Sequence, residues 1–407
     1  MVAVCLKIRI KKRVSFCRPI NEIIFLIWVL ILLLVTGNIC LSQDSLRSSG
    51  DTLSINGQLS LWANYNNNSS LPVTIGGRYI PAINYGIRTG GNKLIDFEAS
   101  ANLYGTVAFL PFDKATADGS LKPYRLWTRY SSDQFELRLG LQKINFGSAS
   151  LLRPLMWFDQ MDPRDPLHLT NGVWALLARY YFLNNANVWL WGLYGNYDPR
   201  AWELIPTNKK IPEFGGRIQF PVPHGEAAFS YHHRNADNRG MILFNDYFEK
   251  IPEDRFGFDA RWDMVAGFWI EGSWTRKRIN IGTLTNQEIF NAGIDYTFGL
   301  GNGLYAAYEH LIFSYDQRAF GLANRTSFSL IILSYPTGLF DKLSAIVYFN
   351  WTNKTIYNFI TWQKQFDNLI LYIMGYWNPD AYQLPSQTGS RNLFSGKGIQ
   401  LMFVFNH

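Results

Sequence analysis

The sequence predicts an all-β fold, a transmembrane antiparallel β-barrel of about 18 strands with a range of about 16–18. Three observations predict it. Short segments alternate apolar and polar residues with period two, aromatic residues make up 16% and charged residues only 17% of 407 residues, and the mean hydropathy of -0.08 is nearly neutral. Soluble chains carry about 25% charged residues. A barrel wall with one face towards lipid and the other towards water explains why the chain is rich in aromatic residues and poor in charge and yet nearly neutral in mean hydropathy.

Residues 1–42 have the organisation of a secretory signal peptide. A basic stretch precedes the apolar run "IIFLIWVLILLLV" at 23–35, which is shorter than the ~20 residues that a spanning helix needs. We expect cleavage after Ser42, before Gln43; the alternative is an uncleaved anchor. The leader's six lysines and arginines, less one glutamate, account for +5 of the net charge of +7. The high pI therefore does not indicate nucleic-acid binding.

All 3 cysteines lie in this leader, at Cys5, Cys17 and Cys40. The rest of the chain therefore has no disulfide framework and no cysteine-ligated metal site. We predict no cofactor and no metal: the adjacent His232 and His233 point to opposite faces of a strand, and no H-E-x-x-H motif is present. His310 and Glu309 also alternate in face, so the sequence predicts no catalytic residues and no enzyme.

Residues 43–52 are a short N-terminal segment, and 53–405 carry the barrel pattern. In "LSINGQLSLWANY", Leu53 and Ile55 share one face while Ser54 and Asn56 share the other. Polar residues at every second position suit a lumen wall better than a sandwich core. We expect strands at 53–65, 79–88, 94–110, 122–131, 134–143, 172–182, 186–196, 213–220, 225–234, 254–263, 266–276, 288–298, 303–313, 325–334, 342–351, 355–363, 367–377 and 396–405.

The predicted connections alternate in length. Short turn sequences such as "TGGNK" (89–93), "SSD" (131–133) and "GLGNG" (299–303) carry glycine, serine and asparagine, which favour tight turns. The longer connections are 66–78, 111–121, 143–171, 197–212, 235–253, 277–287, 314–324 and 378–395. Short periplasmic turns and long extracellular loops are the arrangement of outer-membrane barrels.

The last strand, "GKGIQLMFVF", places Ile399, Leu401, Phe403 and Phe405 on one face. This resembles the C-terminal strand of bacterial outer-membrane barrels, which ends on an aromatic residue; Asn406 and His407 follow it here. The resemblance implies a Gram-negative outer-membrane location and recognition by the barrel-assembly machinery through the strand that ends at Phe405. Outer-membrane lipid and lipopolysaccharide are the expected surroundings, with no nucleic-acid partner and a possible homo-oligomer.

One connection departs from the pattern. "GSASLLRPLMWFDQMDPRDPLHLTNG" (147–172) joins the fifth and sixth predicted strands, and Pro154, Pro163 and Pro166 stiffen it. With "LGLQKINFG" (139–147) before it, this region resembles general and substrate-selective porins, among them 18-stranded barrels and the alginate-export family. In porins the third long loop, between strands five and six, folds into the barrel and narrows it. The resemblance implies the same for 143–171.

Charged residues suggest how such a constriction is lined. Five arginines on neighbouring predicted strands form a possible basic ladder: Arg125, Arg129, Arg138, Arg179 and Arg217. With the loop inside, Asp159, Asp162 and Asp165 would face this ladder, Arg153 and Arg164 would pair some of the aspartates, and Trp157 would pack inside or line a strip for sugar rings. The alternative is a set of solvated lumen charges that pair with their neighbours.

The expected function is passive diffusion of small hydrophilic solutes, sugars or anions, through a porin-like channel narrowed by loop 143–171. Two alternatives remain: a plugged barrel that acts as a structural or binding protein, and an outer-membrane hydrolase.

Overall fold

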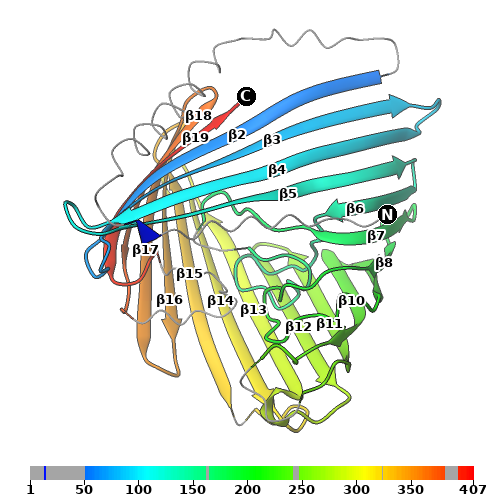
Figure 1. Ribbon diagram of the computed structural model, residues 1–407. Coiled ribbons are helices and arrows are strands. Elements are labelled where there is room, and N and C mark those ends of the chain that lie inside the picture. Colours follow the sequence, from blue (N-terminus) through cyan, green and yellow to red (C-terminus); the bar gives the residue numbers. More distant parts are fainter. Residues whose placement is uncertain (1–12, 15–50, 162–164, 242–246, 323, 381–392) are drawn as a thin grey trace.

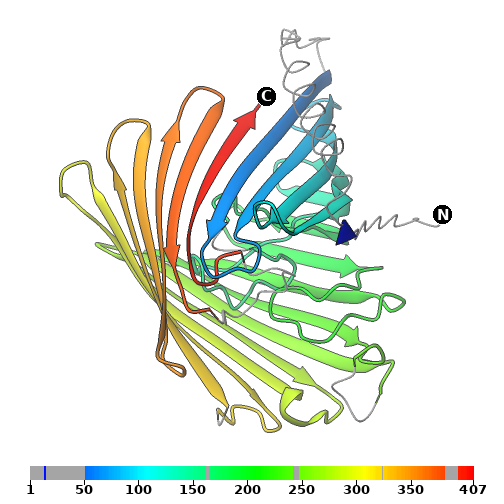
Figure 2. The same cartoon turned by 60° about the vertical axis from the view of Figure 1, so that its left-hand side comes forward.

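The computed structural model describes residues 13–14, 51–161, 165–241, 247–322, 324–380 and 393–407. These residues form a closed antiparallel barrel of 18 strands with almost no helix, which confirms the predicted fold class (Figures 1 and 2). The barrel strands are β2 (Asp51–Asn66), β3 (Val73–Arg88), β4 (Leu94–Phe109), β5 (Ala115–Ser131), β6 (Phe135–Gln142), β7 (Val173–Tyr181), β8 (Asn187–Leu193), β9 (Glu213–Val222), β10 (Gly225–Ala236), β11 (Ile251–Asp263), β12 (Gly267–Lys277), β13 (Asn286–Phe298), β14 (Leu304–Asp316), β15 (Arg325–Pro336), β16 (Asp341–Asn350), β17 (Thr355–Gln365), β18 (Leu369–Trp377) and β19 (Lys397–Asn406).

The ring closes between its two ends. Each strand pairs with the next along the chain, and β19 pairs back onto β2 with Leu401 opposite Ala63. The two-residue β1 (Arg13–Val14) lies outside the ring and pairs with the far end of β5 at Thr116 and Ala115. Closure matters because a spanning strand with an unpaired edge would leave backbone groups without partners in lipid.

The two faces of the wall differ as the alternation predicts. Large apolar side chains such as Ile55, Leu139 and Phe229 are more than half exposed on the outside. Polar side chains such as Asn64 and Glu309 are buried on the inside. The apolar face belongs in lipid, and the polar face surrounds the lumen.

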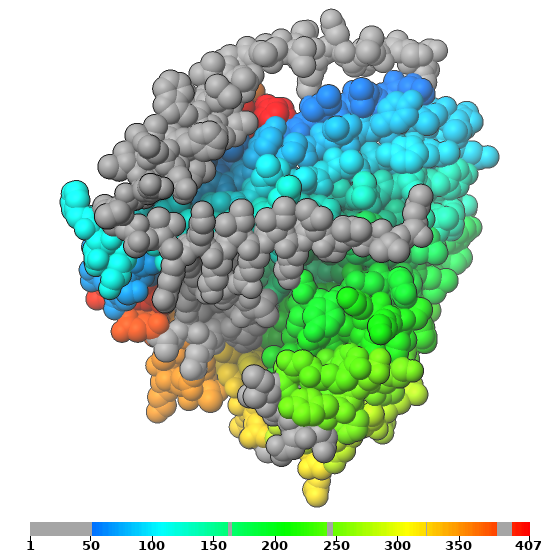
Figure 3. Space-filling view, in the orientation of Figure 1, coloured from blue at the N-terminus to red at the C-terminus, as the bar shows by residue number. Residues whose placement is uncertain are grey.

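The structure places a strand at each of the eighteen predicted positions, but β3 and β5 begin well before their predicted starts at 79 and 122. β3 starts at Val73 and β5 at Ala115, so the connections before them shrink to 67–72 and 110–114. Gly76, Gly77 and Gly119 lie in the missed stretches, and their turn-forming composition suggested loops. As a result β2 to β5 are 16, 16, 16 and 17 residues long, and Figures 1 and 3 show them side by side, in blue to teal.

The connections follow the predicted alternation elsewhere. The turn between β3 and β4 reverses the chain through Gly90 and Gly91, whose φ angles of 94° and 57° glycine adopts without strain. The other end of the barrel carries the longer connections, among them 143–172, 194–212 and 237–250. The predicted signal peptide (1–42) lies outside the described residues except for β1, as do residues 43–50 of the N-terminal segment.

No helix in the described part of the chain is long and apolar enough to cross a membrane.

A lipid-facing charge tests the orientation of the wall. Leu401 lies midway along β19 with its side chain outside, so Leu401→Arg should lower the free energy of unfolding by about 2–4 kcal/mol in lipid vesicles. Leu339→Arg makes the same substitution in a turn beyond the strands and should cost at most about 1 kcal/mol. Denaturant titration of both variants measures the difference. Equal destabilisation by the two substitutions would contradict the assigned outer face.

Candidate functional site

The chain leaves the wall after β6 and crosses the inside of the barrel before it returns as β7. Residues 143–172, the lumen loop, contact inward-facing side chains of β11, β12 and β14. Gly147 permits the close approach: its φ is +107°, and a Cβ there would lie 2.6 Å from Glu271 Oε2. Figures 1 and 2 show the segment between β6 and β7 inside the curved sheet.

Two buried carboxylates of the far wall hold the lumen loop by its backbone. Glu309 of β14 accepts hydrogen bonds from three successive amides, with N···O distances of 2.6 Å to Ser150, 3.3 Å to Leu151 and 2.7 Å to Leu152. Glu271 of β12 accepts from Ala149 at 2.9 Å and from Leu155 at 2.5 Å. The barrel therefore supplies the acceptors that irregular backbone needs when it is buried away from water.

Apolar packing extends this attachment around the wall. Leu151, Leu152, Met156 and Met161 belong to a buried cluster with side chains from β13 to β18. Leu155, Trp157 and Phe158 form a second cluster with Phe146 and with Val173, Ala175, Leu177, Trp191 and Leu193. The indole of Trp157 donates to Ser273 Oγ at 2.9 Å. The lumen loop is thus packed as a core rather than suspended in solvent.

A second connection, 194–212, covers the lumen loop. Trp202 donates from Nε1 to the carbonyl of Arg153 at 2.8 Å. Arg200 forms ion pairs with Glu203 (2.9 Å) and with Glu213 of β9 (2.6 Å). These contacts fix 194–212 to both the wall and the lumen loop.

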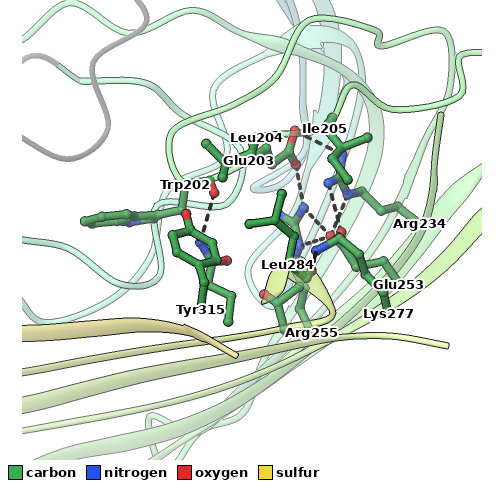
Figure 4. A pocket seen from close by; sticks show the side chains of 12 residues that line it. Trp202, Glu203, Leu204, Ile205, Arg234, Glu253, Arg255, Lys277, Leu284 and Tyr315 are labelled. Atoms are coloured by element: carbon green, nitrogen blue, oxygen red, sulfur yellow. Dashed lines mark hydrogen bonds and ion pairs between the residues drawn. The ribbon is translucent and has the colours of Figure 1, made fainter. Parts of the chain in front are cut away.

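Glu203 lies at the centre of a buried ion network (Figure 4). Its carboxylate contacts Arg255 at 2.7 Å and Arg234 at 3.2 Å, and both arginines also contact Glu253 at 2.6 Å. Burial opposes the charge of Glu203, but the surrounding arginines keep its pKa below the ordinary value. The space between these side chains is about 10 Å³, room for about one water molecule. The network therefore holds the connection 194–212 to the barrel wall and has no room to bind a solute.

The inner wall of β4 to β7 is different, because its charges remain partly open to the lumen. Arg129, Arg138 and Arg179 are 27%, 15% and 15% exposed, and all three contact Glu136 at 3.7, 3.1 and 3.6 Å. Arg129 also binds Asp96 bidentately at 2.9 and 2.6 Å. We call these five residues the arginine wall.

Two tryptophans back the arginine wall. The guanidinium carbon of Arg138 lies 4.7 Å from the ring centroid of Trp127, and that of Arg179 lies 3.9 Å from Trp189. The Nε atoms of Arg138 and Arg179 have no hydrogen-bond partner among the described residues. Arg129 is paired with Asp96, whereas Arg138 and Arg179 share the single carboxylate of Glu136. The two arginines therefore carry more positive charge than Glu136 neutralises, and this excess can attract an anion.

The other predicted constriction residues are distributed differently. Arg125 donates to the carbonyl of Thr170 at 3.0 Å, near the return of the lumen loop to the wall. Arg217 pairs with Asp259 at 2.5 Å, away from the arginine wall. The five arginines of the predicted basic ladder therefore do not lie together: Arg129, Arg138 and Arg179 form one group, and Arg125 and Arg217 lie elsewhere. Among the described residues, neighbouring carboxylates pair with all of them except Arg125.

Asp159 pairs with Arg153 at 3.4 Å, which confirms that Arg153 pairs one of the loop aspartates. Asp159 forms no ion pair with Arg125, Arg129 or Arg138 in the described part of the chain, and burial raises its pKa above the ordinary value. Asp165 forms an ion pair with Arg78 of β3 at 3.6 Å. Asp162 and Arg164 lie outside the described residues.

Sequence reasoning missed the roles of Glu309, Glu271 and Arg78. The two glutamates lie within the predicted strands 303–313 and 266–276, and their partners lie 116 to 159 residues away along the chain. Arg78 lay in a predicted connection, so it was not assigned to a wall. An acidic residue at an inward-facing strand position, on a wall that a long loop can reach, is the sequence signal that could have indicated how the lumen loop is held.

In the described part of the chain, no group of three or more histidine, cysteine, aspartate and glutamate side chains is arranged to hold a metal ion.

No protein-family model and no curated protein sequence matches the chain. Among solved structures, the trimer form of in-vitro folded OmpT from Vibrio cholerae is 10% identical and covers 88% of this chain and 100% of its own, with a TM-score of 0.49. OmpF of Salmonella typhi, in complex with daunomycin, is 10% identical and covers 88% and 98%, with a TM-score of 0.48.

The anion-selective porin from Comamonas acidovorans is 14% identical, covers 88% of this chain and 100% of its own, and has a TM-score of 0.44. By their descriptions, these structures include an outer membrane protein and an anion-selective porin. At these identities the likeness concerns the fold.

Removal of the Glu309 carboxylate tests how the lumen loop is held. Glu309→Ala leaves three buried amides without an acceptor, and each unsatisfied group costs about 1–3 kcal/mol. We expect faster hydrogen exchange at residues 150–152, measured by mass spectrometry on the folded barrel. Glu226→Ala removes a glutamate whose side-chain hydrogen bond to Gln219 is exposed, and it should leave this exchange unchanged. Unchanged exchange in Glu309→Ala would contradict the attachment.

Proposed function

We propose that this protein is an outer-membrane channel through which small hydrophilic solutes, sugars or anions, diffuse passively, and that loop 143–171 narrows it. The proposal includes export with a cleaved signal peptide, assembly through the strand that ends at Phe405, and surroundings of outer-membrane lipid and lipopolysaccharide. A homo-oligomer is compatible with it.

One observation carries the proposal: the two halves of the lumen differ. Towards β11 to β18 the lumen loop and residues 194–212 pack tightly against the wall. Towards β4 to β7 the arginine wall keeps partly exposed guanidinium groups beside tryptophan rings. A narrowed passage with a charged, aromatic lining selects small polar solutes and attracts anions.

A plugged barrel is the second candidate, and the packing of two connections inside the lumen favours it. Sixteen buried side chains form the largest internal cluster, and this cluster joins the lumen loop to the wall. If the connections fill the whole cross-section, the protein is a structural or binding protein whose outer loops contact partners.

A hydrolase has less support. His310 Nδ1 lies 2.9 Å from Ser329 Oγ, which resembles part of a nucleophile–base pair. However, no carboxylate in the described residues contacts His310, and the Ser329 hydroxyl is also bound by Tyr308 and Trp351. The pair lacks the acid that orients the histidine in hydrolytic triads.

Conductance separates the first two candidates. In planar bilayers the folded protein should give discrete single-channel steps, and deletion of residues 148–168 should enlarge them, since it removes the segment that occupies the lumen. Heat-dependent mobility on gels verifies that the variant is folded. Folded wild-type protein without conductance would reject the channel, and equal conductance of the deletion variant would reject the narrowing role.

Ion selectivity tests the arginine wall. The double variant Arg138→Gln/Arg179→Gln keeps side chains of similar shape but removes two positive charges from the lumen. The reversal potential in a salt gradient should shift towards cation preference. Arg239→Gln should leave it unchanged, because this side chain is 48% exposed and its charge is already paired with Asp237 and Glu249. No shift in the double variant would place the passage elsewhere.

A further inference from the structure

A surface cavity lies at the long-loop end of β12 and β13, separate from the lumen. Its volume is about 620 Å³, and Trp274, Arg276, Arg278, Asn286 and Arg318 contribute to its lining. Two connections border it, one through Arg278, Asn280 and Thr285 and the other through residues 317–319. Trp274, Arg276 and Asn286 occupy outward-facing strand positions, and Arg278 and Arg318 lie in connections, so the channel proposed above has no use for these residues.

Strand register shows where this cavity lies relative to the membrane. Tyr231, Phe256 and Trp274 stand opposite one another on β10, β11 and β12. The ring centroids of Trp274 and Phe256 are 5.4 Å apart, and those of Trp274 and Phe320 are 5.2 Å apart. Phe256 is 45% exposed on the lipid-facing side. A row of aromatic rings across outer strand positions marks the boundary between lipid and water in membrane barrels.

The next outward-facing row, two residues nearer the long loops, is polar. His233, Asp254, Arg276 and Asn286 stand opposite one another on β10 to β13. The change from aromatic to polar within one step places the cavity at the level of the lipid headgroups.

The cavity has positive charge that the protein does not neutralise. Asp254 binds Arg278 at 2.7 and 3.2 Å and also accepts hydrogen bonds from Tyr231 and His233, each at 2.8 Å. The guanidinium groups of Arg276 and Arg318 form no ion pair with any described residue. Asp316, opposite Asn286 in the same row, accepts a hydrogen bond from the backbone amide of Arg318 at 3.0 Å and not from its guanidinium group. Two free guanidinium groups therefore face the same cavity, beside a carboxylate that is already occupied.

We infer that this cavity binds the phosphate group of a glycolipid in the outer leaflet, with Arg276 and Arg318 as its ligands. Guanidinium groups bind phosphate oxygens bidentately, which favours phosphate over an uncharged headgroup. The aromatic row directly below would contact the lipid part, for which a free phosphate ion has no need. The long-loop end faces the outer leaflet under the outer-membrane placement proposed above, on which this inference rests.

The test is lipid binding to the full-length barrel in detergent, measured by native mass spectrometry. The probes are diphosphorylated lipid A, its dephosphorylated form, phosphatidylglycerol and inorganic phosphate. We expect lipid A to bind with a 1:1 stoichiometry, and Arg276→Gln/Arg318→Gln to weaken binding at least about tenfold, because two charge-assisted contacts are lost. The matched control is Arg88→Gln/Lys342→Gln, which removes two exposed cations at the short-turn end and should bind lipid A as the wild type does.

The outcomes are distinct. Equal binding of dephosphorylated lipid A or of phosphatidylglycerol, displacement of lipid A by equimolar inorganic phosphate, or unchanged affinity in Arg276→Gln/Arg318→Gln would each overturn the inference. The same preparations are tested for conductance. Conductance without selective lipid A binding overturns the lipid site alone, whereas lipid A binding by a folded, non-conducting barrel overturns the channel alone.

Discussion

The arrangement inside this barrel is determined by one requirement: backbone amides that are buried away from water must each have a hydrogen-bond acceptor. A strand satisfies its amides through its neighbours, but a segment that leaves the wall and enters the lumen loses both neighbours and much of its water. Glu309 and Glu271 supply the missing acceptors from the far wall. Each carboxylate serves several amides at once, which concentrates the attachment of the loop in two side chains.

The remaining interior follows from this attachment. Once Leu151 and Leu152 are held at β14, their side chains reach the apolar surface of β15 to β18 and the cluster there can close. Trp202 then binds the backbone of Arg153, and residues 194–212 cover the loop. The buried network around Glu203 completes the sequence of contacts, since it holds this second connection to β9, β10 and β11. These contacts depend on one another in space: the lumen loop provides the surface on which residues 194–212 pack, and those residues in turn carry Glu203 into the ion network.

The wall was predictable from the sequence because it repeats. Period-two alternation depends only on neighbouring residues, so it located eighteen strands and the connection that departs from the rule. Local composition misled only where glycines lie within strands, at Gly76, Gly77 and Gly119. Glycine favours turns by default, and a strand in a closed barrel tolerates it because the two flanking strands hold it in place.

The partners inside the lumen were predictable only in part. The sequence predicted that Arg153 pairs a loop aspartate, as it does with Asp159, but it did not predict the ion pair of Asp165 with Arg78. Opposite charges can pair in many combinations, and the choice depends on where the loop backbone is fixed. That position depends on Glu309, which is separated from its amide partners by more than 150 residues.

The different lengths of β5 and β6 also affect the side of the barrel. β5 has 17 residues and β6 only 8, and the two strands pair only between Leu126 and Ser131 of β5, because the chain turns inwards after Gln142. Residues that could have raised the wall beside β5 instead occupy the lumen. The wall is therefore low at the long-loop end of β6, where the lumen loop departs, and β5 has no β6 partner before Leu126. The arginine wall lies towards the opposite end of β6, beside the short turn 132–134, so it is below the point at which the chain turns inwards.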